Sequence, residues 1–313
     1  MPPSDLQDIK PQDIKGVFAA ALTLLDADLT PDTKASVAHC QWLLANGCDG
    51  IGLLGTTGEA PSFSVAQRRG LLDAALENGI PNSRLIVGTG AAALSDAIEL
   101  TAHAVASGVS GCLVVPPFYF KNISDEGLFA SYATLIERVG RADLRLFLYH
   151  FPQMSAVPIP HGVIARLVRA FPGTIAGLKD SSGDLDNMLA LIEAFPDLRI
   201  FSGTERYLLA VLEAGGAGCI TAGANVTSRE IGRLYAHWLD SGGGAETVTL
   251  QERVAALRDL IEGVPMIAAM KVLIARHRGQ PGLARVAPPL ADLGDEETAA
   301  FLMRLDEAGL TLP

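Results

Sequence analysis

Between residue 16 and about residue 240 the chain repeats one unit eight times, a short apolar run followed by an amphipathic segment. The segments tend to begin at Ser, Thr or Asp and to end at Gly, which are start and stop signals of helices. A unit of roughly thirty residues suits a strand plus a crossover helix. The predicted strands cover residues 16–21, 50–55, 84–90, 111–117, 144–150, 174–179, 198–203 and 217–223.

Near-continuous apolar runs such as "CLVV" at 112–115 indicate strands buried on both faces, and hence a parallel sheet. Eight such units in a row predict an α/β protein with a closed (β/α)₈ TIM barrel. A doubly wound open sheet is the alternative. Its Gly-rich dinucleotide-binding turn is missing after the first strand, where "AALTLLDADLTPD" stands.

The same start and stop residues predict the helix ends and the division into domains. The clearest predicted helix starts are Thr30, which is followed by Pro31, Ser64 and Ser124. The corresponding helix ends are Gly47, Gly79 and Gly140. We assign residues 1–240 to the barrel, with the barrel proper starting near residue 16. Residues 241–313 are predicted to form a C-terminal helical bundle packed on the barrel, with helices near 246–262, 264–278 and 295–308.

Composition excludes several partners. A net charge of -11 argues against a nucleic-acid groove and against binding to an anionic membrane surface. The start "MPPSDLQDIKPQDIK" lacks the apolar core of a secretory signal, and no later apolar run is long enough to span a bilayer, so we predict a cytoplasmic protein. The cysteines are scattered without metal-binding spacing and are predicted to be buried thiols, not a metal site: Cys40, Cys48, Cys112 and Cys219.

Lys179 is unusual because it closes a strand-like apolar run, in "GLKDSSG" at 177–183. A buried lysine costs free energy unless it is paired or deprotonated. Two explanations therefore compete, a structural ion pair and a reactive amine. The other lysines lie in polar or helical surroundings: Lys10, Lys15, Lys34, Lys121 and Lys271.

Reactive groups of a barrel enzyme lie at the C-terminal ends of its strands. Lys179 and Tyr149 both stand at such ends. Strand alternation places Lys179 on the inner face together with Ile175 and Gly177, whereas Thr174, Ala176 and Leu178 face the helices. Likewise Tyr149 shares its face with Phe147, and His150 points away from the barrel centre.

Two further strand ends carry hydroxyl groups. The turn "GTTGE" at 55–59 offers the hydroxyls of Thr56 and Thr57 with free backbone N–H groups, a combination that can hold a carboxylate. The same sequence also makes an ordinary strand-to-loop turn, so the motif alone is not decisive. The fourth strand ends in "PPFYFKN", which places Tyr119 at the rim.

Together these motifs resemble those of the dihydrodipicolinate synthase and N-acetylneuraminate lyase superfamily of class I, Schiff-base-forming aldolases. The resemblance covers nearly the whole chain, from the first strand to "RVAPPL" near residue 285. It rests on "GTTGE", "PPFYF", "LYHFP" and "GLKDSSGD", which occur in the family's order and on the expected strands.

The resemblance implies roles for individual residues. Lys179 would form the imine and Tyr149 would carry protons, while Thr56 and Thr57 would hold the carboxylate of a 2-oxo acid. Tyr119 would reach across a dimer interface to complete a neighbouring subunit's hydroxyl relay. Gly203 and Ile220 would line the pocket at the ends of strands seven and eight. The family also implies a homotetramer or homodimer.

The chemistry of an imine requires such a set. A lysine attacks a ketone only as the free amine, and burial in an apolar interior favours that form. The imine stabilises the enamine that forms when a neighbouring carbon–carbon bond breaks or forms. Tyr149, polarised through Thr57 and Tyr119, can move the protons. No metal, nucleotide or other cofactor is needed.

Several positions depart from the family pattern. Met154 stands where the true synthases carry an arginine that grips the second substrate's carboxylate, which argues against the synthase reaction. His150 replaces an asparagine and is interpreted as a structural hydrogen-bonding residue. Glu205 and Arg206 stand where sialic-acid lyases carry acidic groups for sugar hydroxyls. Arg206 either meets a second anionic group of the substrate or is a surface arginine.

The sequence thus predicts a Schiff-base lyase or aldolase that acts on pyruvate or another 2-oxo acid, such as a 2-keto-3-deoxy sugar acid. Alternatives on the same scaffold are a dehydratase, a hydratase-aldolase for aromatic substrates, and dihydrodipicolinate synthase itself. An alternative of another class is a barrel that only binds or senses a 2-oxo acid. The four residues Lys179, Tyr149, Thr56 and Thr57 argue against mere binding, which does not need a neutral lysine.

Overall fold

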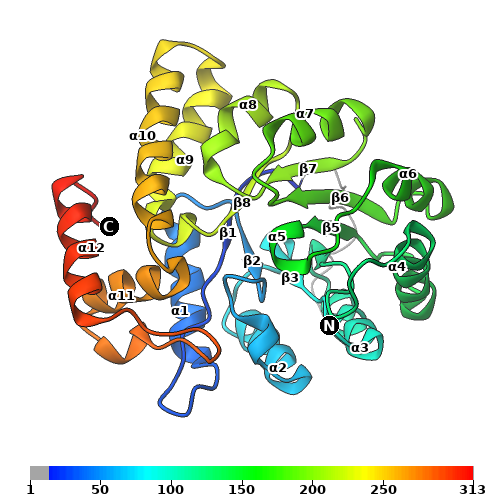
Figure 1. The fold of residues 1–313 in the computed structure, drawn as a ribbon, viewed down its shortest axis with the longest axis horizontal. Helices are drawn as coiled ribbons and strands as arrows, with labels where there is room; N and C mark the ends of the chain where they lie inside the picture. Colours follow the sequence, from blue (N-terminus) through cyan, green and yellow to red (C-terminus); the bar gives the residue numbers. More distant parts are fainter. Residues whose placement is uncertain (1–13, 313) are drawn as a thin grey trace.

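The computed structural model describes residues 14–312 as a closed barrel of eight parallel strands with helices on its outside (Figure 1). The strands follow chain order around the barrel, and β8 pairs with β1 to close it. They are β1 (Gly16–Ala20), β2 (Gly50–Leu53), β3 (Leu85–Gly88), β4 (Gly111–Val114), β5 (Leu146–His150), β6 (Ile175–Asp180), β7 (Arg199–Ser202) and β8 (Gly218–Thr221). All eight predicted strands and the barrel are confirmed.

The helices between the strands form the outer layer, and three more follow the barrel. The outer helices are α1 (Thr33–Ala45), α2 (Val65–Glu77), α3 (Leu94–Ala106), α4 (Asp125–Val139), α5 (Pro152–Ser155), α6 (His161–Ala170), α7 (Leu185–Ala194), α8 (Leu208–Glu213) and α9 (Ala224–Ser241). Short 3-10 turns are η3 (Ala60–Ser62), η4 (Asn82–Arg84), η5 (Glu205–Tyr207) and η6 (Pro281–Ala284). The C-terminal helices are α10 (Ala245–Glu262), α11 (Met266–Arg278) and α12 (Asp295–Glu307). In Figure 1 α10 lies beside α9, α11 lies near α1, and α12 lies on the outer side.

Apolar side chains pack in three regions. One cluster fills the space between the sheet and the outer helices, a second fills the barrel interior, and a third joins the C-terminal helices to the loop after β1. The interior cluster contains Phe18, Phe147, Phe201 and Ile220, which close the barrel beneath the strand ends. The barrel interior below the strand ends is therefore apolar, and the polar side chains considered for catalysis lie at the strand ends.

Two local predictions were wrong. Asp32, not Thr30, caps α1, because its side chain accepts the N–H of Ala35 whereas Thr30 is held in a turn by Asp26. On β6 the strict alternation fails, since Ile175 packs in the outer cluster and Ala176 in the barrel interior. The cause is a bulge in β6: Leu146 pairs with Ile175 and the next residue of β5, Phe147, pairs with Gly177, so Ala176 is an extra residue that shifts the alternation.

The four cysteines are free and buried, as predicted. Burial raises the pKa of the Cys40, Cys48 and Cys112 thiols to about 12. No helix within residues 14–312 combines the length and apolar character that a bilayer crossing requires. The prediction that the start of the chain lacks the apolar core of a secretory signal concerns residues 1–15, most of which lie outside the described residues.

Lys271 lies on helix α11, in agreement with the helical surroundings expected from the sequence, and its side chain is completely buried. Its ammonium pairs with the buried carboxylate of Glu59, the last residue of the "GTTGE" turn, and donates to the carbonyl of Arg285 at 2.8 Å. The second oxygen of Glu59 accepts the N–H of Ala287 at 2.7 Å. The C-terminal helices are therefore tied directly to the turn that carries Thr56 and Thr57.

Replacing Lys271 with methionine should lower the free energy of unfolding by about 3–5 kcal/mol, because Glu59 would be left as an unpaired buried charge. Urea unfolding of both proteins measures the loss. The exposed Lys34→Met serves as the matched control and should change stability by less than about 0.5 kcal/mol. The double variant Lys271→Met with Glu59→Gln should regain part of the loss, and equal stability of wild type and Lys271→Met would contradict the ion pair.

His39 on α1 is buried and joins α1 to α9. Its Nε2 lies 2.9 Å from Oδ1 of Asn225, which also accepts the N–H of Leu22, and its Nδ1 lies 3.4 Å from the Arg278 guanidinium. An acceptor on one side and a donor on the other require the neutral ring with its proton on Nε2. Burial lowers the pKa of His39 from 6.5 to about 4.

Because the pKa of His39 is lower in the folded state, its contribution to stability is present above pH 6.5 and is lost as the pH falls toward 4. Between pH 7 and pH 5 we expect wild type to lose about 2 kcal/mol through this residue. Urea unfolding of wild type and His39→Gln at both pH values checks this. A pH dependence that is the same in the two proteins would contradict it.

Candidate active site

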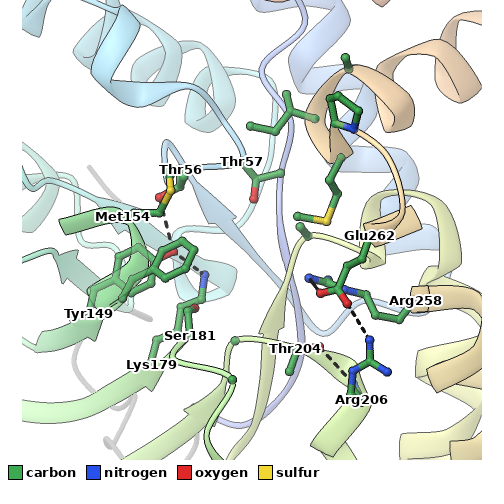
Figure 2. A pocket seen from close by; sticks show the side chains of 18 of the residues that line it. Thr56, Thr57, Tyr149, Met154, Lys179, Ser181, Thr204, Arg206, Arg258 and Glu262 are labelled. Carbon is green, nitrogen blue, oxygen red and sulfur yellow. Dashed lines mark hydrogen bonds and ion pairs between the residues drawn. The ribbon is translucent and has the colours of Figure 1, made fainter. Parts of the chain in front are cut away.

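A cavity of about 530 Å³ opens at the C-terminal ends of the barrel strands. Seven of the residues singled out from the sequence line it, namely Thr56, Thr57, Tyr149, Met154, Lys179, Gly203 and Arg206. In Figure 2 the catalytic candidates lie on one side of the cavity, and a group of charged side chains lies opposite: Arg206, Arg258 and Glu262.

Lys179 lies at the inner end of this cavity and is 5% exposed. Its Nζ donates to the hydroxyl of Tyr149 at 3.4 Å and lies 4.5 Å from the centre of the Tyr149 ring. Within residues 14–312 no carboxylate forms an ion pair with Nζ of Lys179. The neighbouring Asp180 is occupied elsewhere, since it accepts from Asn187 and from the N–H of Ser182. The structural ion-pair explanation of Lys179 therefore has no partner in the described chain.

Tyr149 connects the lysine to the "GTTGE" turn. Its hydroxyl lies 3.4 Å from Nζ of Lys179 and 3.4 Å from Oγ1 of Thr56. Register explains the closeness, because Tyr149 on β5 pairs directly with Lys179 on β6. The expected partner, Thr57, is mostly buried and lines the cavity, but the hydroxyl in contact with Tyr149 is that of Thr56.

Tyr119 does not line the cavity of its own chain. Its ring packs edge-on against Phe120 with the ring centres 5.4 Å apart, and these side chains are 74% and 70% exposed. The predicted relay from Thr57 through Tyr149 to Tyr119 is therefore absent within one described chain. A contribution of Tyr119 to a neighbouring subunit stays a prediction.

Two predicted pocket residues lie elsewhere. Ile220 is completely buried in the barrel interior, one layer below the cavity, and Ala222 lines the cavity in its place. Glu205 is also completely buried, in η5, where its carboxylate accepts from Thr221 and pairs with Arg258 at 3.1 Å. The 3-10 turn after β7 directs Glu205 away from the cavity, so it is unavailable for substrate hydroxyls.

Arg206 lines the cavity, but its guanidinium is already paired. Its two terminal nitrogens lie 2.5 Å from Asp259 and 2.6 Å from Glu262, both on α10. Arg258 lies 2.7 Å from the same Glu262. Burial acts to raise the pKa of Glu262. The Arg258 guanidinium and its hydrogen bond outweigh burial and hold this pKa below its ordinary value. Arg206 is thus neither an isolated surface arginine nor an unoccupied anion site.

Two residues that depart from the family pattern, His150 and Met154, lie on β5 and in the segment that follows it. Met154 on α5 is 60% exposed and presents a thioether at the cavity. His150 points away from the barrel, where its Nδ1 accepts the N–H of Ile159 at 3.1 Å. This contact agrees with the structural role predicted for His150.

Sequence reasoning missed the contribution of the C-terminal segment. The cavity is also lined by side chains that follow the eighth β-α unit, among them Arg258, Glu262, Pro265, Met266, Ile267 and Leu290. The β-α period ends before these residues, so no spacing in the sequence connects them with the strand ends. Within the described residues no cluster of three His, Cys, Asp or Glu side chains could hold a metal ion.

Comparison with known proteins decides the family. The model of the dihydrodipicolinate synthetase family matches residues 13–308. The chain belongs to this family. The resemblance found in the motifs is thereby confirmed, and the protein is an enzyme of the lyase class.

Individual relatives within the dihydrodipicolinate synthetase family show how the chain compares. An uncharacterized DapA-like lyase of Chloroflexus aurantiacus is 36% identical, covering 92% of this chain and 94% of the relative. The 4-hydroxy-tetrahydrodipicolinate synthase of Agrobacterium fabrum is 32% identical over 95% of this chain and 99% of the relative. The family match is therefore spread over the whole barrel and the C-terminal helices.

Solved structures of relatives agree that the similarity extends over nearly the whole chain. Dihydrodipicolinate synthase from Agrobacterium tumefaciens has a TM-score of 0.85 at 32% identity, covering 94% of this chain and 99% of that one. YagE of Escherichia coli, a member of the family solved in complex with pyruvate, has a TM-score of 0.85 at 22% identity, covering 95% of this chain and 99% of that one. At that identity YagE supports the fold alone.

Proposed function

We propose that this enzyme forms an imine between Lys179 and the second carbon of a 2-oxo acid, and that it breaks or joins the bond between the third and fourth carbons. The observation that carries this is the buried Nζ of Lys179, which has no carboxylate partner among residues 14–312 and lies 3.4 Å from the Tyr149 hydroxyl inside a cavity. The amine of a lysine is the group that attacks the carbonyl carbon of a ketone, and the cavity gives a small substrate access to this one.

The residues divide the work as follows. The hydroxyls of Thr56 and Thr57 hold the carboxylate, which places the ketone carbon beside Nζ. Nζ attacks this carbon, and the ketone oxygen leaves as water after taking up protons. Tyr149 contacts both Nζ and Thr56, so it can carry a proton between the lysine and the reacting carbon or oxygen. The enamine then forms when a bond to the third carbon breaks.

Met154 favours aldol chemistry over the dihydrodipicolinate synthase reaction. The synthase's second substrate carries an additional carboxylate, and the thioether of Met154 cannot replace a guanidinium there. Arg206 cannot supply the charge either, because Asp259 and Glu262 already neutralise it. We expect no condensation of pyruvate with aspartate semialdehyde above the uncatalysed rate.

The test is hydrogen exchange at the methyl group of pyruvate. If the imine converts to the enamine, that group exchanges its protons for deuterium in D₂O, and proton NMR follows the loss of signal. Wild type should exchange pyruvate protons far faster than the buffer alone. A barrel that only binds a 2-oxo acid would bind pyruvate without exchange, and this outcome would refute the proposal.

A homodimer or homotetramer would place Tyr119 at a neighbouring subunit's cavity. The exposed pair of Tyr119 and Phe120 at the strand-end face supports this part of the proposal. Tyr119→Phe should then lower kcat by about 10-fold while Phe120→Tyr leaves it unchanged, because only the former removes a hydroxyl. A monomer in sedimentation velocity at assay concentration, with full activity, would contradict the role of Tyr119.

A further inference from the structure

The turn at residues 55–59, which carries Thr56 and Thr57, has a left-handed residue at each end. Leu54, just before the turn, has a φ of 59°, and Glu59, its last residue, has a φ of 54°. This conformation is unfavourable for a residue with a side chain unless the surrounding structure imposes it. Contacts from other parts of the chain must therefore hold the turn in its shape.

The barrel supplies contacts to the backbone of the turn. Thr23, which is completely buried in the loop after β1, donates to the carbonyl of Gly58 at 2.8 Å. Gly58 also lies close to the loop, because a Cβ added there would come within 2.8 Å of the carbonyl oxygen of Ala21. Gly88 on β3 leaves the space that the carbonyl of Leu54 occupies. These contacts hold residues 54 and 58 but do not reach the side chain of Glu59.

The C-terminal segment holds Glu59 through its carboxylate, which is 2% exposed. One oxygen pairs with the ammonium group of Lys271 on α11, and the other accepts the N–H of Ala287 at 2.7 Å. Lys271 is itself fixed, because it also donates to the carbonyl of Arg285 at 2.8 Å. With both oxygens bonded to fixed groups, the side chain of Glu59 is held in one orientation.

A gain in stability does not by itself explain a buried ion pair at this place. Removing two charges from water costs free energy that their attraction only partly returns, and well-packed apolar residues are often equally stable. The position of the pair offers another explanation. The N–H of Glu59 donates to the carbonyl of Thr56 at 3.0 Å, and the hydroxyl of Thr56 lies 3.4 Å from that of Tyr149. A rotation of Glu59 would therefore move Thr56 relative to the catalytic tyrosine.

We propose that Glu59 and Lys271 are positioning residues, which fix the end of the turn and thereby the direction in which Thr56 and Thr57 present their hydroxyls to the substrate. Neither Glu59 nor Lys271 lines the cavity, so both act through the two threonines. This inference rests on the proposed function, in which the threonines hold the carboxylate of a 2-oxo acid. The C-terminal helices thus contribute to the affinity for the substrate as well as to stability.

Methyl exchange in pyruvate, followed at increasing pyruvate concentration, gives KM and kcat separately. In Lys271→Met we expect KM to rise at least about 10-fold, because the threonines no longer hold the carboxylate in a fixed geometry. We expect kcat to fall less than about 3-fold, because Nζ of Lys179 and the hydroxyl of Tyr149 keep their contact. An unchanged KM in the folded variant would overturn the inference.

Two further variants separate positioning from stability. Leu305→Ala removes a completely buried side chain of α12 and destabilises the packing of the C-terminal helices, but it leaves the pair of Glu59 and Lys271 intact. Its KM should stay within about 2-fold of wild type. The double variant Lys271→Met with Glu59→Gln has no unpaired buried charge, so it should regain stability yet keep the raised KM, because residue 59 is no longer joined to α11.

A KM that follows stability would contradict the inference, whether it is raised in Leu305→Ala or restored in the double variant. If Lys271→Met does not fold, the double variant decides the question. Wild type tests the underlying function separately. Exchange by wild type with an unchanged KM in the double variant refutes the positioning role alone, whereas absence of exchange by wild type refutes the imine mechanism, and the inference falls with it.

Discussion

Replacing Lys179 with methionine should lower kcat/KM by roughly 10⁵- to 10⁶-fold, the loss seen when an enzyme's nucleophile is removed. Methionine has nearly the same length and suits the buried position, so the fold should be retained. The reason for the loss is chemical, because without Nζ no imine can form and the third carbon of the substrate is no longer activated. Steady-state kinetics with the best substrate measures the effect.

Circular dichroism and urea unfolding must show that Lys179→Met is folded. The exposed Lys34→Met is the control for the substitution and should keep full activity. Residual activity within about 100-fold of wild type would mean that the lysine only assists binding, since positioning groups have effects of that smaller size.

Tyr149→Phe should lower kcat by about 10²- to 10⁴-fold, the usual contribution of a general acid or base. The substitution keeps the ring that packs over Lys179 and removes only the hydroxyl that contacts Nζ and Thr56. KM should change much less than kcat, because the Tyr149 hydroxyl takes part in proton transfer, whereas the carboxylate of the substrate is held by Thr56 and Thr57. Stopped-flow measurement of imine formation would show the slowed step.

Tyr132→Phe is the matched control for this experiment. Its hydroxyl donates to the carbonyl of Val114 at 3.1 Å, outside the cavity, so its loss should cost about 1 kcal/mol of stability and leave kcat unchanged. An equal fall of kcat in both variants would point to a general effect on the fold and would contradict the proton-carrying role of Tyr149.

The barrel could be predicted because its signals are local and repeated. Each strand appears as a short apolar run, and the eight runs keep one period. Lys179 and Tyr149 could be predicted for the same reason, since the end of a parallel strand fixes where its last side chain lies. Alternation failed on β6 because Ala176 is an extra residue relative to β5, and only the pairing of the two strands reveals such a bulge.

Other features depend on contacts between distant parts of the chain. Glu59 and Lys271 are separated by 212 positions, and nothing near either residue indicates the other. Glu205 follows a strand end, as pocket residues do, but the 3-10 turn after β7 directs its side chain toward Arg258 on α10. The outer wall of the cavity belongs to the C-terminal segment, whose position against the barrel is set by packing and not by the β-α period.

The central claim is that Lys179 forms an imine, and borohydride reduction in the presence of pyruvate tests it most directly. Intact mass should show one reduced pyruvyl adduct per wild-type chain and none on Lys179→Met, and peptide mapping should place the adduct on the peptide that contains Lys179. An adduct on another lysine, or none with pyruvate and a panel of other 2-oxo acids, would contradict the claim.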